Sequence, residues 1–328
     1  MATLSLAEAE DLVTQALVRN RTSEKNAQAV AKALVLAEAD GIKSHGLIRL
    51  PLYAAQAKKQ KVDGFATPSL ERPRVGAIVI DAKNGFAYPA IDLAIGMLRG
   101  ITPASGIAAA GIGRSHHCGA AGHHAERLAQ AGLVALFFAN GPAAMAPWGG
   151  KNAVFGTNPI AFACPLPERE PIVVDLSLSK VARGNVLAAA QKGEPIPEGW
   201  AFDADGRPTT DAKAALYGTM APLGDAKGTA LALMVELLAA GLTGSNFAAE
   251  ASSYFDAEGP PSMTGQFIIA MDPAAFASGV ERFQVLAQSI EEQEGARLPG
   301  IRRLVLRKRA MEHGITISDT LLAEIKAL

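Results

Sequence analysis

Apolar residues recur every three or four positions near the start of the chain, which predicts two amphipathic helices. The first is expected directly after Ser5, because Ser5 and Glu8 form a capping box. The second is expected over 24–39, and Gly41 and Gly46 follow where a helix would end. The chain therefore begins with a helical layer.

The middle of the chain alternates short apolar runs with helical patterns. The runs are bounded by turn residues and predict strands at 76–81, 106–110, 133–139, 160–164, 172–175 and 265–271. Helical spacing predicts further helices at 49–59, 90–99, 123–131, 226–241 and 273–294, with two more helical segments in the tail. This order favours a mixed α/β (α+β) fold with helices from both chain ends around a central sheet.

The chain divides into three expected segments. An N-terminal helical segment (1–75) would pack with the C-terminal tail, a sheet-containing domain (76–272) would hold cofactor and substrate, and a C-terminal helical segment (273–328) would follow. No repeat or low-complexity linker separates them, so these boundaries are soft.

Composition narrows the possible partners. A chain of 328 residues, 49% of them hydrophobic, can bury a large core. Its 31 basic and 32 acidic residues create no cationic field, so neither nucleic acid nor an anionic membrane is an expected partner. Cys118 and Cys164 are expected to be free thiols of a cytoplasmic protein. Glu236 interrupts the one long apolar run, so no membrane span is expected.

The stretch SHGLIR (44–49) places a hydroxyl, an imidazole and a guanidinium close together. A guanidinium binds a carboxylate through two parallel hydrogen bonds, and an imidazole transfers protons near neutral pH. Arg49 would then hold a substrate carboxylate, while His45 would carry a proton and Ser44 would orient it. The alternative is an ordinary helix C-terminus, where His and Arg suit the dipole and Gly46 takes a left-handed turn.

Four of the six histidines cluster at His116, His117, His123 and His124. They are adjacent or six to eight residues apart, whereas a metal pair on one helix needs a spacing of three or four, so no metal site is expected. Most of them are expected at helix caps or on the surface. The small residues at 119–122 would let a phosphate or a flat ring approach the backbone at a helix start.

Other loops contain glycine or polar residues directly after apolar runs, where phosphate-binding motifs occur. The GIG sequence at 111–113 lacks the third glycine of a dinucleotide fingerprint, and a Rossmann site is therefore not expected. Polar residues also follow apolar runs at 155–159, 175–179 and 224–228, where they are either simple turns or ligand contacts.

These motifs together resemble the type-2 malate/L-lactate dehydrogenase family. In chain order they are SHG..R, SHH.GAAG, PWGG, GTNP, D.S.S and KG, between residues 44 and 228. Within that family, the segments 232–247 and 297–303 are most similar to the Δ1-piperideine-2-carboxylate/Δ1-pyrroline-2-carboxylate reductases, which reduce cyclic imino acids to pipecolate and proline with NADPH. The resemblance implies a homodimer and a non-Rossmann nicotinamide-binding fold on a largely antiparallel or mixed sheet.

The resemblance also implies roles for individual residues. The relay and proton donor would be Ser44 and His45. The substrate-binding positions would be Arg49, Thr157, Arg183 and Gly184. The cofactor-binding positions would be His117, Cys118, Gly119, Ala120, Ala121, Asp175, Leu176, Ser177, Ala226, Lys227, Arg297, Arg302 and Arg303. The arginines and Lys227 are candidates for the extra phosphate of NADPH, with NADH also possible.

Departures from the reductase pattern keep a second function open. The reductases carry an aromatic residue and alanine at Cys118 and Gly119, a histidine at Ala226 and a smaller or neutral group at Arg183. GAAG after His117 is closer to hydroxy-acid dehydrogenases, in which that histidine is the catalytic base. The expected function is an NADPH-dependent imino-acid reductase, and the alternative is an NAD-dependent malate, lactate or ureidoglycolate-type dehydrogenase. Metal binding or storage by the histidine cluster is a third, non-enzymatic possibility.

Overall fold

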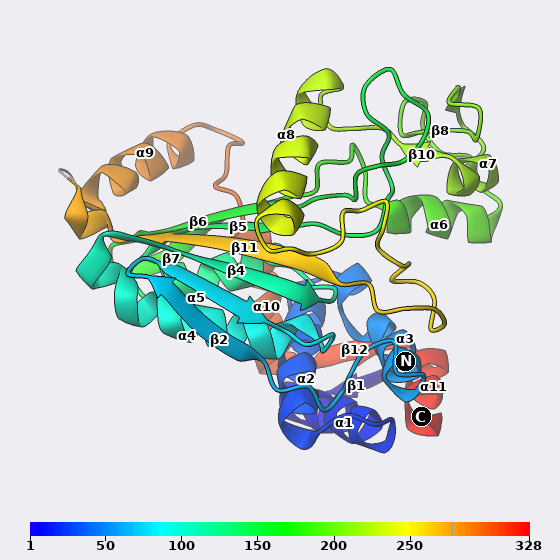
Figure 1. The fold of residues 1–328 in the computed structure, drawn as a ribbon, viewed down its shortest axis with the longest axis horizontal. Coiled ribbons are helices and arrows are strands. Elements are labelled where there is room, and N and C mark those ends of the chain that lie inside the picture. The colour runs from blue at the N-terminus through cyan, green and yellow to red at the C-terminus, as the bar shows by residue number, and fades with distance from the viewer. Residues whose placement is uncertain (277–278) are drawn as a thin grey trace.

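A seven-stranded sheet forms the centre of the computed structural model, which describes residues 1–276 and 279–328 (Figure 1). Its order is β2-β3-β4-β11-β5-β6-β7. The strands are β2 (Ser69–Arg74), β3 (Ala77–Asp81), β4 (Ile107–Ser115), β5 (Val134–Ala139), β6 (Ile160–Leu166), β7 (Arg169–Leu176) and β11 (Thr264–Met271). Within this sheet β3 and β4 pair in parallel and the other neighbours are antiparallel. The predicted largely antiparallel, mixed sheet is confirmed, and all six predicted strands belong to it.

Side-chain alternation along the strands separates two cores. Ile268 and Ala270 of β11 face the helices α4 (Ala87–Ser105) and α5 (Ala121–Ala129). Phe267 and Ile269 face the opposite side, where α8 (Ala226–Glu236) and its neighbours pack. Figure 1 shows α4 and α5 below the sheet and α8 above it. Both faces of the sheet are covered, as its apolar strands require.

The two chain ends share a third core. It joins the helices α1 (Leu6–Arg19), α2 (Glu24–Ala39), α3 (Leu50–Lys58), α10 (Ile301–His313) and α11 (Asp319–Ala327). The strand β1 (Ala2–Leu4) pairs with β12 (Ile315–Ile317), so the termini lie side by side (Figure 1). The capping box of Ser5 and Glu8 is present as predicted. The three-segment division of the chain stays a prediction.

The remaining elements were predicted in part. A small three-stranded sheet has the order β10-β8-β9. Its strands and the two helices of the same segment are α6 (Arg183–Lys192), β8 (Ala201–Phe202), β9 (Pro208–Thr209), α7 (Ala212–Tyr217) and β10 (Thr219–Met220). These elements were not predicted, because strands of two residues leave no periodic signal. The helix expected at 226–241 is α8 followed by the π-helical turn η3 (Leu237–Gly241).

The prediction of one continuous helix at 273–294 is wrong. The described part consists of the short turn η4 (Pro273–Ala275) and the helix α9 (Glu281–Glu291), while residues 277–278 lie outside the described residues. Across the described chain, no helix combines the length and apolar character needed to cross a membrane.

Candidate functional site

A cavity of about 1240 Å³ lies between the N-terminal helices, one end of the central sheet and the start of α10. Its walls contain most of the predicted site residues: Ser44, His45, Arg49, His117, Cys118, Gly119, Ala120, Ala121, Thr157, Asp175, Leu176, Ser177, Arg183, Gly184, Arg297, Arg302 and Arg303. Segments that are far apart in sequence therefore meet in one place. The volume exceeds that of an ordinary small-molecule pocket, so a dinucleotide and a small substrate fit together.

The segment 44–49 forms two 3-10 turns, η1 (Lys43–His45) and η2 (Leu47–Arg49), rather than a helix end. Ser44 Oγ lies 3.0 Å from His45 Nδ1, and Arg49 Nε donates to the Ser44 carbonyl at 2.7 Å. The hydroxyl thus pairs with the imidazole, and the guanidinium is held by the main-chain carbonyl of the same serine.

The left-handed turn considered for Gly46 is wrong, because its φ is −90°. Glycine is needed there for space: a Cβ would lie 2.2 Å from a carboxylate oxygen of Glu38. That carboxylate accepts the Leu47 N–H at 3.1 Å and so holds the turn against α2.

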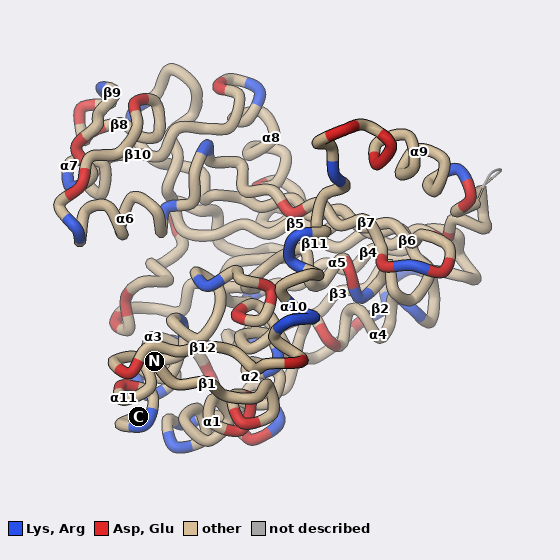
Figure 2. The backbone as a smooth tube through the Cα atoms, turned by 180° about the vertical axis from the view of Figure 1, so that it is seen from behind, with Lys and Arg blue, Asp and Glu red and all other residues tan. Residues whose placement is uncertain are grey.

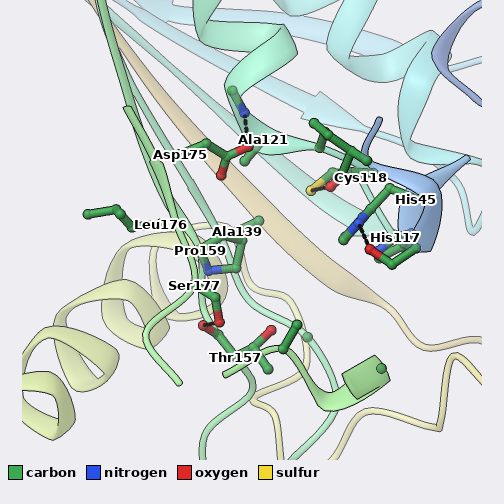
Figure 3. A pocket seen from close by; sticks show the side chains of 18 of the residues that line it. His45, His117, Cys118, Ala121, Ala139, Thr157, Pro159, Asp175, Leu176 and Ser177 are labelled. Carbon is green, nitrogen blue, oxygen red and sulfur yellow. Dashed lines mark hydrogen bonds between the residues drawn. The ribbon is translucent and has the colours of Figure 1, made fainter. Parts of the chain in front are cut away.

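His45 and His117 face each other across this corner of the cavity. Their rings stack with centroids 5.3 Å apart and an interplanar angle of 22°. Figure 3 shows both histidines beside Cys118, with Asp175, Leu176, Ser177 and Thr157 on the opposite side. Desolvation and nearby Arg49 lower the pKa of His45 to about 4 and hold the pKa of His117 well below its usual range. Both imidazoles are therefore neutral at pH 7, which is the form that accepts a proton.

The prediction that most clustered histidines lie at caps or on the surface is wrong. His116, His123 and His124 are all buried. His123 Nε2 lies 2.9 Å from an Asp40 oxygen, and His124 Nε2 lies 2.7 Å from the Cys118 carbonyl. The described residues contain no group of three His, Cys, Asp or Glu side chains that could hold a metal ion.

The glycine-rich loop before α5 presents its backbone to the cavity. Gly119 has a φ of +70°, and a Cβ there would lie 2.8 Å from the Tyr88 hydroxyl. The helix α5 starts without a side-chain cap, and Asp175 Oδ2 accepts the Gly122 N–H at 2.8 Å. Desolvation raises the pKa of Asp175, and the Gly122 hydrogen bond opposes this.

This donor set fits a nicotinamide dinucleotide. The N–H groups that precede Gly122 at this helix start suit a pyrophosphate, and Asp175, with one oxygen occupied by the Gly122 N–H, has its other oxygen for ribose hydroxyls. The residues that would hold the dinucleotide are the loop 117–121, Asp175 and basic residues of 297–302.

Arg303 forms ion pairs with two carboxylates of the protein itself. It contacts Asp40 at 3.1 Å and Glu126 at 2.8 Å, and Arg307 contacts the same two carboxylates. These four side chains fasten α10 to α2 and α5, and Figure 2 shows basic stretches of α10 lying among acidic ones. In the described chain, Arg297 and Arg302 make no ion pair, so they are better placed than Arg303 to meet a cofactor phosphate.

Thr157 is positioned by a carboxylate that sequence reasoning treated only as an interruption of an apolar run. Glu236 is buried and accepts from Asn158 Nδ2 at 2.9 Å, Asn140 Nδ2 at 3.2 Å and Ala248 N at 3.2 Å. Burial raises its pKa, and these donors oppose the rise. Glu236 thereby joins the loop that carries Thr157 and Asn158 to the segments at Asn140 and Ala248.

Arg183 is a further guanidinium in the cavity wall, outside the 297–303 segment. It is half-buried at the start of α6, and burial lowers its pKa. Its one hydrogen bond is to the Leu216 carbonyl at 3.4 Å. Among the described residues it has no acidic partner, which leaves its charge for a ligand.

Two predicted cofactor residues are not brought to the cavity. Ala226 and Lys227 lie at the start of α8, and neither lines the cavity of the single chain. Tyr254 and Phe255 line it without having been predicted.

Comparisons with known proteins agree with this geometry. The family model described as malate/L-lactate dehydrogenase matches residues 4–326. A (2R)-3-sulfolactate dehydrogenase (NADP(+)) from Chromohalobacter salexigens is 51% identical over 326 residues, covering 99% of this chain and 97% of that protein. A Δ1-pyrroline-2-carboxylate/Δ1-piperideine-2-carboxylate reductase from Pseudomonas aeruginosa is 41% identical over 333 residues, covering 100% and 99%. The crystal structure of Δ1-piperideine-2-carboxylate reductase from Pseudomonas syringae pv. tomato has a TM-score of 0.94 and 39% identity, covering 100% and 99%.

The mixed sheet, the cavity and these matches define an oxidoreductase of the non-Rossmann type. The chain belongs to the malate/L-lactate dehydrogenase family, as the sequence motifs indicated.

Proposed function

We propose that this protein is an NADP-dependent dehydrogenase that interconverts a 2-hydroxy acid and its 2-oxo acid, where the substrate carries a second strong anion, as 3-sulfolactate does. The observation that carries this proposal is that, besides the arginines of 297–303 assigned to the cofactor, two more guanidiniums, Arg49 and Arg183, line the same cavity and have no acidic partner among the described residues. Two unpaired guanidiniums at one site favour a dianionic ligand.

The comparisons support the same choice of substrate and cofactor. The relative that is 51% identical is named for 3-sulfolactate and NADP(+). A 2-hydroxy acid was the alternative function expected from the sequence, and the imino acid was the first. The higher identity, 51% against 41%, supports placing the 2-hydroxy acid first.

Each group at the site has a defined task in this reaction. Arg49 binds the substrate carboxylate and Arg183 binds the second anion, so the substrate is held at both ends. A neutral imidazole, His117 or His45, accepts the proton of the C2 hydroxyl. NADP, when bound, supplies the chemistry of hydride transfer at C2. Thr157 lines the same cavity, and its hydroxyl donates a hydrogen bond to the substrate.

Substrate binding also changes the basicity of the two histidines. The charge of Arg49 contributes to the lowered pKa of both His45 and His117. A carboxylate bound to Arg49 offsets that charge, so the pKa of each imidazole rises when substrate is present. Proton uptake is therefore coupled to occupation of the anion site.

Reduction of a cyclic imino acid is the second candidate. The relatives at 41% and 39% identity, which are named as pyrroline- and piperideine-carboxylate reductases, favour it. The paired Ser44 and His45 beside Arg49 suit a proton donor next to a carboxylate anchor. This candidate leaves Arg183 without a partner, since its substrate has one carboxylate.

A substrate panel tests the proposal. Purified enzyme is assayed with 3-sulfolactate, malate and lactate in the oxidative direction, and with pyrroline- and piperideine-2-carboxylate in the reductive direction, each with both cofactors. The expected result is the highest kcat/KM with 3-sulfolactate and NADP. Turnover of the cyclic imino acids alone would replace the proposal with the second candidate.

We further propose that the enzyme is a homodimer. The second half of α8 is largely apolar around its circumference, and Leu231, Leu233 and Met234 of α8 are exposed in the single chain together with Leu237 of η3. A helix that is apolar all round is normally buried, and a second copy of this chain would cover it. Sedimentation of the purified protein tests this directly.

A further inference from the structure

A buried lysine outside the cavity binds one of its loops. Lys61 lies just beyond the end of α3, and its side chain is 2% exposed. Its ammonium donates to the carbonyls of Ser253 at 2.8 Å, Asp256 at 2.9 Å and Glu258 at 2.8 Å. An ammonium has three donors, so these three carbonyls satisfy it completely.

Gln56 of α3 holds the same segment, which we call the 253–258 loop. Its Nε2 donates to the carbonyls of Tyr254 at 3.1 Å and Asp256 at 3.0 Å. In the described chain, no backbone N–H donates to any of these four carbonyls. The loop forms no helix or strand of its own (Figure 1, yellow loop beside α3). Hydrogen bonds from the buried side chains of Gln56 and Lys61 therefore satisfy its carbonyls in place of backbone–backbone hydrogen bonds.

The 253–258 loop carries the two aromatic residues that line the cavity. The ring of Phe255 lies under the Arg49 guanidinium, with 4.9 Å between Arg49 Cζ and the ring centroid. The ring of Tyr254 lies 5.1 Å from that of His117. A cation–π contact fixes the plane of a guanidinium while leaving its edge free for a carboxylate.

From these contacts we infer that Lys61 is a positioning residue for the substrate carboxylate. It holds the 253–258 loop, the loop places Phe255 beneath Arg49, and Phe255 together with the Ser44 carbonyl orients the guanidinium. Lys61 touches neither substrate nor cofactor and acts through Phe255. The inference rests on the proposed role of Arg49 as the carboxylate anchor.

Two lysines just after α3, which both contact the 253–258 loop, provide a matched comparison. Lys59 contacts Glu258 Oε1 at 3.1 Å from the solvent side, and both of those side chains are exposed. Lys61→Met removes the buried ammonium, while Lys59→Met removes an exposed charge that contacts the same loop. Gln56→Leu releases the loop without removing a charge, so it serves as a second variant if Lys61→Met does not fold.

The measurement is KM for substrate and for NADP separately, with kcat and the thermal midpoint recorded for each variant. The substrate is 3-sulfolactate, or pyrroline-2-carboxylate if the wild type turns over only that compound. Lys61→Met is expected to raise substrate KM about tenfold, to leave NADP KM within about twofold, and to act through Phe255. Lys59→Met is expected to change neither. Combining Lys61→Met with Phe255→Leu is then expected to give little beyond the larger single effect.

Three results would overturn the inference. They are an unchanged substrate KM in a folded Lys61→Met or Gln56→Leu variant, equal rises in KM for substrate and NADP, and additive effects of Lys61→Met and Phe255→Leu. Absence of turnover by the wild type with every substrate would instead reject the proposed function. The affinity of each variant for 3-sulfolactate, measured by calorimetry, distinguishes these cases without turnover.

Discussion

The hydroxyl oxygen of Tyr53 lies 2.5 Å from Nδ1 of His117. Tyr53 is buried on α3, and burial raises its pKa to about 12, so it stays protonated. Its hydrogen bond occupies Nδ1 and leaves Nε2 of His117 for a ligand in the cavity. The Tyr88 hydroxyl lies 3.4 Å beyond, at the limit of a hydrogen bond.

Tyr53→Phe is expected to lower kcat about 10- to 100-fold while the protein stays folded, because a hydrogen-bond partner that orients a functional imidazole contributes on that scale. The pH dependence of kcat tests the cause, since loss of this partner changes the basicity of His117. Tyr88→Phe removes only the weak outer contact and is the control. Equal losses in the two variants would contradict an orienting role for Tyr53.

The two stacked histidines can be distinguished by substitution. If His117 accepts the C2 proton, His117→Asn is expected to lower kcat at least 100-fold in the oxidation of 3-sulfolactate, while His45→Asn costs about tenfold or less through Arg49 and Ser44. Steady-state kcat at several pH values is the measurement. A larger loss in His45→Asn would assign the proton transfer to the Ser44–His45 pair.

Arg183→Gln is expected to raise KM for 3-sulfolactate about 10- to 100-fold, which corresponds to one charged hydrogen bond. Lactate lacks the second anion, so its kcat/KM is expected to change by less than about threefold. The ratio of the two kcat/KM values is therefore the readout. A uniform loss across both substrates would mean that Arg183 supports the fold of the cavity rather than recognising an anion.

Periodicity predicted the architecture because the core elements repeat their apolar residues locally. The six predicted strands and the helices α1 and α2 are examples. The contacts that complete the site are not local. Glu236 reaches Asn140 across 96 residues, and Lys61 reaches Ser253 across 192. Each of these residues stands in a segment whose own pattern describes only an apolar helix or a loop, so no spacing in the sequence reveals its partner.

The candidate cofactor arginines illustrate the same limit. The sequence placed Arg302 and Arg303 together as phosphate ligands, since both are basic and adjacent. On α10 successive side chains point about a quarter turn apart. Arg303 therefore meets Asp40 and Glu126, while Arg302 is exposed at the cavity. The arginine that forms structural ion pairs is therefore determined by the positions of Glu126 on α5 and Asp40 at the end of α2, which the local sequence around 302–303 does not reveal.

Arg302→Ser and Arg303→Gln are accordingly expected to fail in different ways. Arg302→Ser is expected to raise KM for NADP about tenfold, with little change for NAD, because one phosphate contact is lost. Arg303→Gln is expected to lower the free energy of unfolding by about 1.5–3 kcal/mol, because the buried Asp40 and Glu126 lose charged hydrogen bonds and keep Arg307. Denaturant unfolding and cofactor kinetics on both variants measure this. Full stability of Arg303→Gln would contradict the structural role.

His116 makes the protein sensitive to acid. The residue is 1% exposed, neither ring nitrogen has a hydrogen-bond partner among the residues that the structure describes, and burial lowers its pKa to about 3. The unfolded chain binds a proton near pH 6.5 and the native chain does not, so the free energy of unfolding falls as pH drops from about 6.5 toward 3. One such histidine contributes a slope of up to about 1.4 kcal/mol per pH unit in that window.

His116→Phe is expected to remove the contribution of His116 to the pH dependence of the free energy of unfolding. The ring of His116 packs among those of Tyr53, Phe86 and Tyr254, which suit another aromatic ring. Denaturant unfolding between pH 4 and pH 8 is expected to show a shallower dependence in the variant, although His45, His117 and His124 keep part of it. His313→Gln, at an exposed position on α10, is the control and is expected to follow the wild type. An unchanged slope in His116→Phe would mean that the native protein takes up a proton at this ring before it unfolds.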